Sequence, residues 1–85
     1  MTRTEIKTAE QRFYSHAERF SSFNGCQDAI GLYRACAEAH AAASAAIALF
    51  DAGHDAKRWA GNAEMWANKA TFYRARAKDA QLASA

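Results

Sequence analysis

The 85-residue sequence predicts an all-α fold of three long antiparallel helices, a helical hairpin followed by a third helix. Roughly a quarter of the chain is alanine, whereas proline and valine are absent, a composition that favours helix. No segment alternates polar and apolar residues for long enough to form a strand. We expect a single helical domain over residues 1–85, with helices at about 2–22, 27–52 and 55–82.

The first predicted helix opens with a capping box and has one apolar face. Thr2 and Glu5 have the spacing at which a hydroxyl and a carboxylate satisfy each other's free amides. The apolar face repeats at helical spacing through Ile6, Ala9, Phe13, Ala17 and Phe20. The helix is expected to end near Asn24-Gly25, a pair that readily adopts the left-handed conformation.

The second predicted helix, from about Gln27 or Asp28 to Ala52, is apolar nearly all round. Asp28 suits its N-terminal dipole, and Gly53 ends it. Its large side chains point in several directions, and one side holds Ile30, Tyr33, His40 and Ile47. Only a narrow strip of the helix looks solvated, around Arg34, Glu38 and Ala45. This pattern predicts a central, buried helix with His40 in the core.

The third predicted helix follows a cap at Asp55 and carries a heptad seam. The seam runs through Ala56, Trp59, Ala63, Trp66, Ala70, Tyr73, Ala77 and Ala80. Its alanines allow helix backbones to approach closely, while its large rings supply most of the buried area. Trp59, Ala63, Trp66, Ala70 and Tyr73 are therefore predicted to form a core seam or an oligomer seam.

A core of alanine and aromatic residues buries little area in a chain of this length. Burial contributes about 25 cal/mol per Å², and an alanine side chain offers little surface to bury. A second copy would supply the missing apolar contact, so we expect a homodimeric helical bundle. The alternative is a monomeric three-helix bundle.

The sequence lacks the motifs of the common catalytic and metal sites. It has no glycine-rich phosphate loop, no CxxC and no HExxH, and no cysteine or serine has a base at diagnostic spacing. A zinc site built from Cys26, Cys36, His16 and His40 would exist only if packing gathered them. We expect a protein that is not an enzyme, with no catalytic residues, no metal and no cofactor.

The sequence also indicates a cellular setting. The first twenty residues are charged throughout and lack the apolar core of a signal peptide. If Cys26 and Cys36 both lie on one helix, they are too far apart to form a disulfide, and the apolar run at 41–50 is too short for a membrane span. A cytoplasmic protein without membrane contact is expected.

The third helix also carries the candidate partner-binding residues. Arg58, Lys69 and Arg76 project along one line beside the seam, and Met65 and Phe72 stack seven residues apart. Bulky apolar groups flanked by arginine are typical of binding hot spots. We therefore predict an interaction protein that occupies a macromolecular surface, as an inhibitor, anti-activator or adaptor. Bacteria and their phages encode many such regulators of this size.

Two other interpretations of these residues stay open. Met65 and Phe72 could instead pack against the first helix or a second subunit. Alternatively, the basic stripe that runs from Arg58 to Lys78 could bind nucleic acid. The formal net charge of +2 and the acidic Glu64 and Asp79 on the same helix weigh against nucleic acid.

Overall fold

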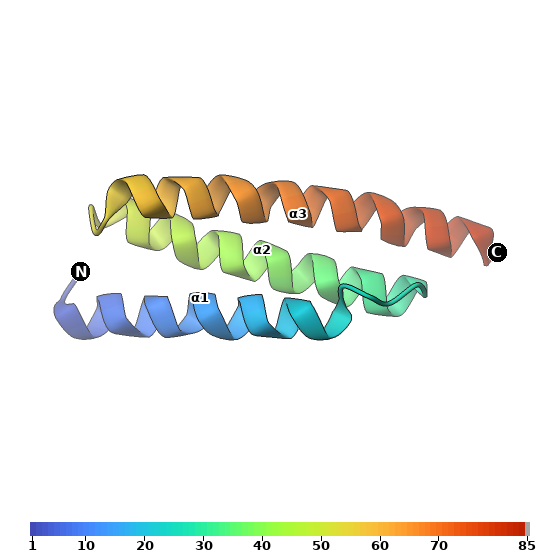
Figure 1. Ribbon diagram of the computed structural model, residues 1–85, viewed down its shortest axis with the longest axis horizontal. Coiled ribbons are helices and arrows are strands. Elements are labelled where there is room, and N and C mark those ends of the chain that lie inside the picture. The colour runs from blue at the N-terminus through green and yellow to red at the C-terminus, as the bar shows by residue number, and fades with distance from the viewer. Residues whose placement is uncertain (85) are drawn as a thin grey trace.

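The computed structural model describes residues 1–84 and contains, in this range, three helices and no strands. The helices are α1 (Arg3–Phe23), α2 (Ala29–Asp51) and α3 (Ala56–Ala83), so the prediction of an all-helical fold with three helices is confirmed. In Figure 1, α1 and α3 run from left to right and α2 returns between them, in a molecule of 48 × 18 × 15 Å. None of these helices combines the length and the apolar character needed to cross a bilayer.

The first two helices begin where their capping residues lie. The Glu5 amide donates to Thr2 Oγ1 at 3.2 Å, and the Thr2 amide donates to Glu5 Oε1 at 3.1 Å, which confirms the capping box. Asp28 caps α2 by accepting a hydrogen bond from the Gly31 amide at 3.2 Å. These caps satisfy amides that the first helical turn leaves without an internal partner.

Two of the expected helix boundaries form differently. Asn24 ends α1 in the right-handed conformation with φ −64°, and Gly25 has no positive φ, so the expected left-handed ending is wrong. Asp55 precedes α3, but its side chain makes no capping hydrogen bond. Its φ of 45° and ψ of 55° lie in the left-handed region, whereas a capping side chain needs an extended backbone. Asp55 therefore completes the turn that begins at Gly53, where φ is 75°.

The buried face of α2 is an alanine seam rather than the side that bears its large residues. The seam repeats in heptads and consists of Leu32, Ala35, Ala39, Ala42, Ala46 and Leu49. Because these side chains are mostly methyl groups, the α2 backbone comes within 8 Å of both α1 and α3. The predicted inward side is wrong, since Ile30 is 68% exposed and Ile47 is 47% exposed. With two neighbouring helices instead of a surrounding ring, α2 buries its small face and leaves the large residues outside.

The predicted solvated strip of α2 partly faces α1 instead. Arg34 is exposed, but Glu38 and Ala45 are half-buried. His16 Nδ1 of α1 lies 2.7 Å from Glu38 Oε2, which accounts for the burial of a carboxylate at this position. Glu38 and Ala45 of this strip therefore lie toward α1, and Arg34 remains in solvent.

Aromatic rings, rather than backbone contacts, connect α1 to α3. Within the described part of the chain, no Cα of α1 lies within 8 Å of a Cα of α3. Edge-to-face contacts fill the space, with ring centroids 4.9 Å apart for Phe13 and Trp59 and 5.1 Å apart for Phe20 and Trp66. We call this set of rings the aromatic ladder, whose members in spatial order are Trp59, Phe13, Trp66, Phe20 and Tyr73. Such pairs contribute about 0.5 to 1.5 kcal/mol each beyond their burial.

Candidate functional site

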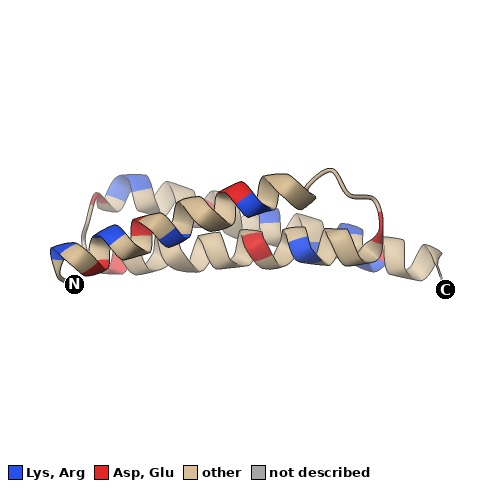
Figure 2. Ribbon diagram, turned by 90° about the horizontal axis from the view of Figure 1, so that it is seen from below, with Lys and Arg blue, Asp and Glu red and all other residues tan. Residues whose placement is uncertain are grey.

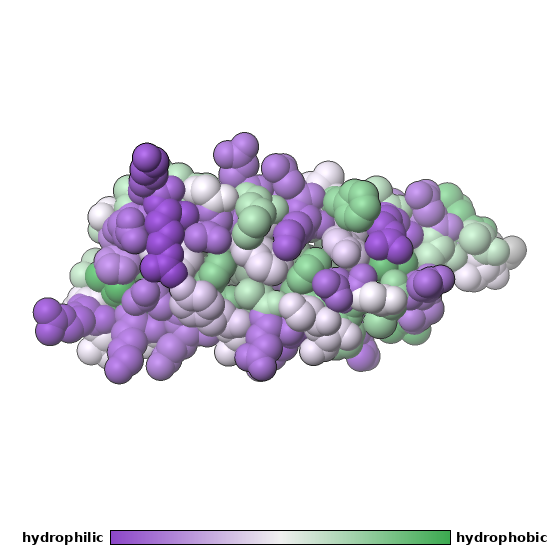
Figure 3. Space-filling view, in the orientation of Figure 1, coloured by the Kyte–Doolittle hydropathy of each residue, from purple (hydrophilic) through white to green (hydrophobic). Residues whose placement is uncertain are grey.

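The five predicted partner-binding residues lie on one flank of α3, which we call the α3 strip: Arg58, Met65, Lys69, Phe72 and Arg76. This flank borders α1, because Arg58 donates a hydrogen bond to the Tyr14 hydroxyl and the Lys69 ammonium lies 5.2 Å from the Phe20 ring centroid. Figure 3 shows the face formed by α1 and α3, where hydrophilic and hydrophobic residues alternate. The structure thus brings all five residues onto a single surface.

Each basic side chain of the α3 strip lies over a ring of the aromatic ladder. The Arg58 guanidinium is 4.7 Å from the Trp59 ring, the Lys69 ammonium 4.5 Å from Trp66, and the Arg76 guanidinium 5.5 Å from Tyr73. Contacts of this kind contribute about 0.5 to 1 kcal/mol at exposed sites. They fix the positions of three positive charges at the edge of the buried rings.

Met65 and Phe72 are the apolar members of the α3 strip. Met65 is 43% exposed and Phe72 is 58% exposed, so neither is buried in this chain. Phe72 contacts Tyr73 edge to face at 5.4 Å, and the Arg76 guanidinium lies 5.9 Å from its centroid. The packing of Met65 and Phe72 into the interface with α1, one of the open interpretations, is therefore excluded within this chain.

The seam residues of α3 occupy the interior of the same chain. Trp59, Trp66 and Ala70 are buried, while Ala63 and Tyr73 are half-buried and pack against the core. Trp59 Nε1 is buried without a hydrogen-bond partner, which offsets part of the stabilisation from this ring. With its rings covered by α1, the seam leaves the α3 strip as the accessible part of this flank.

Tyr14 belongs to the same surface, although sequence reasoning missed it. It is exposed, its ring centroid lies 6.4 Å from that of Trp59, and its hydroxyl accepts the hydrogen bond from Arg58. Tyr14 follows Phe13, off the apolar face of α1. Its proximity to Arg58 depends on the register between α1 and α3, for which the sequence contains no signal.

The histidines and cysteines do not form a second candidate site. His40 is exposed rather than in the core, because it lies on the outward side of α2, at a hollow of about 720 Å³ between α2 and α3. His16 lies on the opposite side of α2, against Glu38. Both cysteines are half-buried thiols, and Cys36 donates to the Ala70 carbonyl at 3.2 Å. Across residues 1–84, no three side chains of His, Cys, Asp or Glu converge as metal ligands would.

Comparisons of the chain with protein-family models, curated proteins and solved structures found no match.

Proposed function

We propose that this chain is a non-enzymatic interaction protein that binds a protein partner through the α3 strip, as an inhibitor, anti-activator or adaptor. The observation that carries the proposal is the exposure of Met65 and Phe72 beside charges held by cation–π contacts. Exposed large apolar side chains next to arginine and tyrosine have the composition of interface hot spots.

The rigidity of the α3 strip supports this role. Its side chains project from the longest helix, and its three cations lie over buried or half-buried rings. Binding therefore orders few additional side chains, which lowers the entropic cost of association. The partner surface that suits the strip is apolar at its centre and acidic at its edge.

The proposal also includes the dimeric architecture expected for a core that buries little area. In it, the antiparallel helices with their alanine and aromatic core form a homodimer, which leaves the α3 strip free for the partner. The elongated shape and the exposed large side chains of α2 favour a second copy.

Affinity capture from a lysate of the native host tests the partner-binding surface. We expect one protein to be retained in stoichiometric amount by the wild-type chain and lost with Phe72→Ala. The control is Leu82→Ala, which removes another exposed apolar side chain from α3 outside the strip. Retention by Phe72→Ala, or equal loss with both variants, would contradict the proposed surface.

Nucleic-acid binding is the second candidate function, because Arg58, Lys69 and Arg76 are aligned on one exposed flank. Three phosphate contacts would lower the logarithm of the binding constant by about 2 to 3 for each tenfold rise in salt. Capture that disappears after nuclease treatment and has this salt dependence would favour nucleic acid. Capture that resists both nuclease and salt would exclude it.

A further inference from the structure

The outward side of α2 exposes large apolar residues to solvent. We call this surface the α2 outer face, and it consists of Ile30, Tyr33, Ala37, His40, Ala41, Ser44 and Ile47. Ile30, Tyr33 and Ile47 are exposed, and small side chains separate Tyr33 from Ile47. This face lies on the opposite side of the molecule from the aromatic ladder.

The α2 outer face is almost free of charge. From Ala35 to Phe50 the only charged residue is Glu38, which is turned toward α1 and bonded to His16. In Figure 2, α2 has few coloured bands, and the exposed Arg34 is the charged residue within the Ile30–Ile47 segment besides Glu38. A helix face that remains in water normally carries charged residues, so this pattern indicates a covered surface.

The total surface of the chain is also larger than that of a compact monomer. Its accessible area is 5528 Å². A compact monomer of 9.3 kDa would expose about 5,000 Å². The difference of several hundred Å² is of the order that one copy would bury in a small dimer.

Two large residues of the α2 outer face lie at equal distances from its centre. Tyr33 and Ile47 lie seven residues before and after His40, and Ala37, Ala41 and Ser44 lie between them. A twofold axis at His40 that reverses α2 would bring Tyr33 of one copy level with Ile47 of the other. A twofold interface uses the same patch on both copies, so this placement would pair the two apolar side chains twice.

We propose that a second copy of this chain covers the α2 outer face, with the two α2 helices antiparallel and crossing at His40. Ala37, Ala41 and Ser44 permit close approach of the helices at the crossing. Hollows of about 680 and 720 Å³ flank α2 on its α1 and α3 sides and receive the larger side chains. Glu5 and Arg12 of α1 and Arg74 of α3 also line these hollows, so charged residues lie at the edges of the proposed interface.

The size of this interface suggests a reversible dimer. Ile30 to Ile47 span about 25 Å of helix, and the molecule is 18 Å broad. Two copies would therefore bury roughly 900 Å², which is below the lower limit of about 1,200 Å² for stable specific interfaces and typical of weak, transient ones. This inference rests on the self-association within the proposed function and is independent of the α3 strip.

Analytical ultracentrifugation of the full chain over 1–200 µM tests the proposal. We expect the wild-type protein to shift from 9.3 kDa toward twice that mass. Tyr33→Lys and Ile47→Glu each place a charge in the α2 outer face, and each should raise the dimer dissociation constant at least 100-fold. Ala75→Glu, on the exposed back of α3, should dimerise as the wild type does. Circular dichroism verifies that every variant retains its helix content.

Mixing the two charge variants tests the orientation. In an antiparallel crossing at His40, Tyr33 of one copy faces Ile47 of the other, so Tyr33→Lys and Ile47→Glu should form a mixed dimer. Mixing that restores no dimer would overturn the antiparallel arrangement. Dimers that survive both single substitutions would overturn the α2 interface but leave self-association intact. A wild-type chain that stays at 9.3 kDa would overturn self-association without affecting the partner-binding proposal.

Discussion

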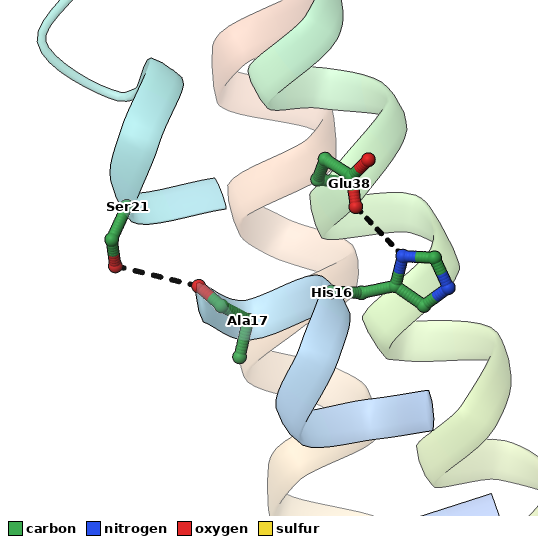
Figure 4. A network of polar contacts seen from close by, with 4 residues as sticks. All are labelled: His16, Ala17, Ser21 and Glu38. Atoms are coloured by element: carbon green, nitrogen blue, oxygen red, sulfur yellow. Dashed lines mark hydrogen bonds and ion pairs between the residues drawn. The ribbon is translucent and has the colours of Figure 1, made fainter. Parts of the chain in front are cut away.

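His16 Nδ1 of α1 lies 2.7 Å from Glu38 Oε2 of α2, and the two residues are 22 positions apart in the sequence. Their side chains are 27% and 20% exposed, so the contact is partly shielded from water (Figure 4). The surrounding residues of α2 are mostly alanine, which imposes little register by shape alone. This polar pair therefore helps to set the register between α1 and α2.

A double-mutant cycle with His16→Ala and Glu38→Ala should give a coupling energy of about 1 kcal/mol, because partial burial strengthens a hydrogen-bonded pair. Urea denaturation of the wild type, the single variants and the double variant measures it. The control cycle pairs His54 with Glu10, whose Nε2 and Oε2 atoms are 3.9 Å apart at a more exposed site. We expect less than about 0.5 kcal/mol there, and equal coupling in the two cycles would contradict a register role for His16 and Glu38.

The capping box lowers the pKa of Glu5, chiefly through the hydrogen bond that its carboxylate accepts from the Thr2 backbone amide. The folded-state pKa is thus below the unfolded value, so the stabilisation is present above the ordinary glutamate pKa of about 4.3. It is lost as the pH falls through the lowered folded-state value. Thr2→Ala keeps the backbone amide but removes the hydroxyl, the second cause of the lowered pKa, so it should raise the Glu5 pKa part of the way toward its ordinary value in an NMR titration. Thr4→Ala on the same turn should not, and a Glu5 pKa unmoved by Thr2→Ala would contradict the box.

Trp66 and Phe72 are rings on the same helix with opposite environments. Trp66 is buried between Phe13 and Phe20, whereas Phe72 is mostly exposed. Trp66→Ala should lower the free energy of unfolding by about 3 to 5 kcal/mol, and Phe72→Ala by less than about 1 kcal/mol. Chemical denaturation monitored by circular dichroism measures both. Similar losses would mean that Phe72 is buried in solution, for instance by a second copy.

Gly31 and Gly61 lie in helices but differ in the space around them. A Cβ at Gly31 would lie 2.6 Å from Cys26 Sγ, whereas a Cβ at Gly61 would meet nothing within 4 Å. Gly31→Ala should therefore destabilise the chain by about 1 to 3 kcal/mol. Gly61→Ala should stabilise it by about 0.5 to 1 kcal/mol, because alanine favours helix. Thermal unfolding compares the two variants. Stabilisation by both would show that the loop around Cys26 moves aside without lowering the free energy of unfolding.

The termini of the helices illustrate which features local sequence predicts well. The Thr2–Glu5 box joins residues three positions apart and forms as predicted. Asp28 was predicted to suit the N-terminal dipole of α2, and its side chain also caps the Gly31 amide. Asp55 is also a suitable residue type for an N-cap and directly precedes α3. Its left-handed backbone, imposed by the tight turn after Gly53, turned the side chain away from the amides.

The orientation of α2 illustrates what periodicity alone left undecided. Its sequence contains two stripes, the alanine seam through Ala39 and the larger residues around His40, and either could face inward. We predicted burial of the larger residues, because hydrophobicity favours them. The heptad spacing of Ala35, Ala39, Ala42 and Ala46 repeats that of the α3 seam. This spacing correctly indicates the buried face of α2.

The sequence by itself determined the three helices, the capping box of α1 and the heptad seam of α3, because each depends on residues a few positions apart. Only the tertiary structure decided which side of α2 is buried, how Phe13 and Phe20 interleave with the rings of α3, and that Tyr14 meets Arg58. These features depend on the register and distance between helices. Close approach through alanine on one side and separation by aromatic rings on the other are collective results of packing that no single helix specifies.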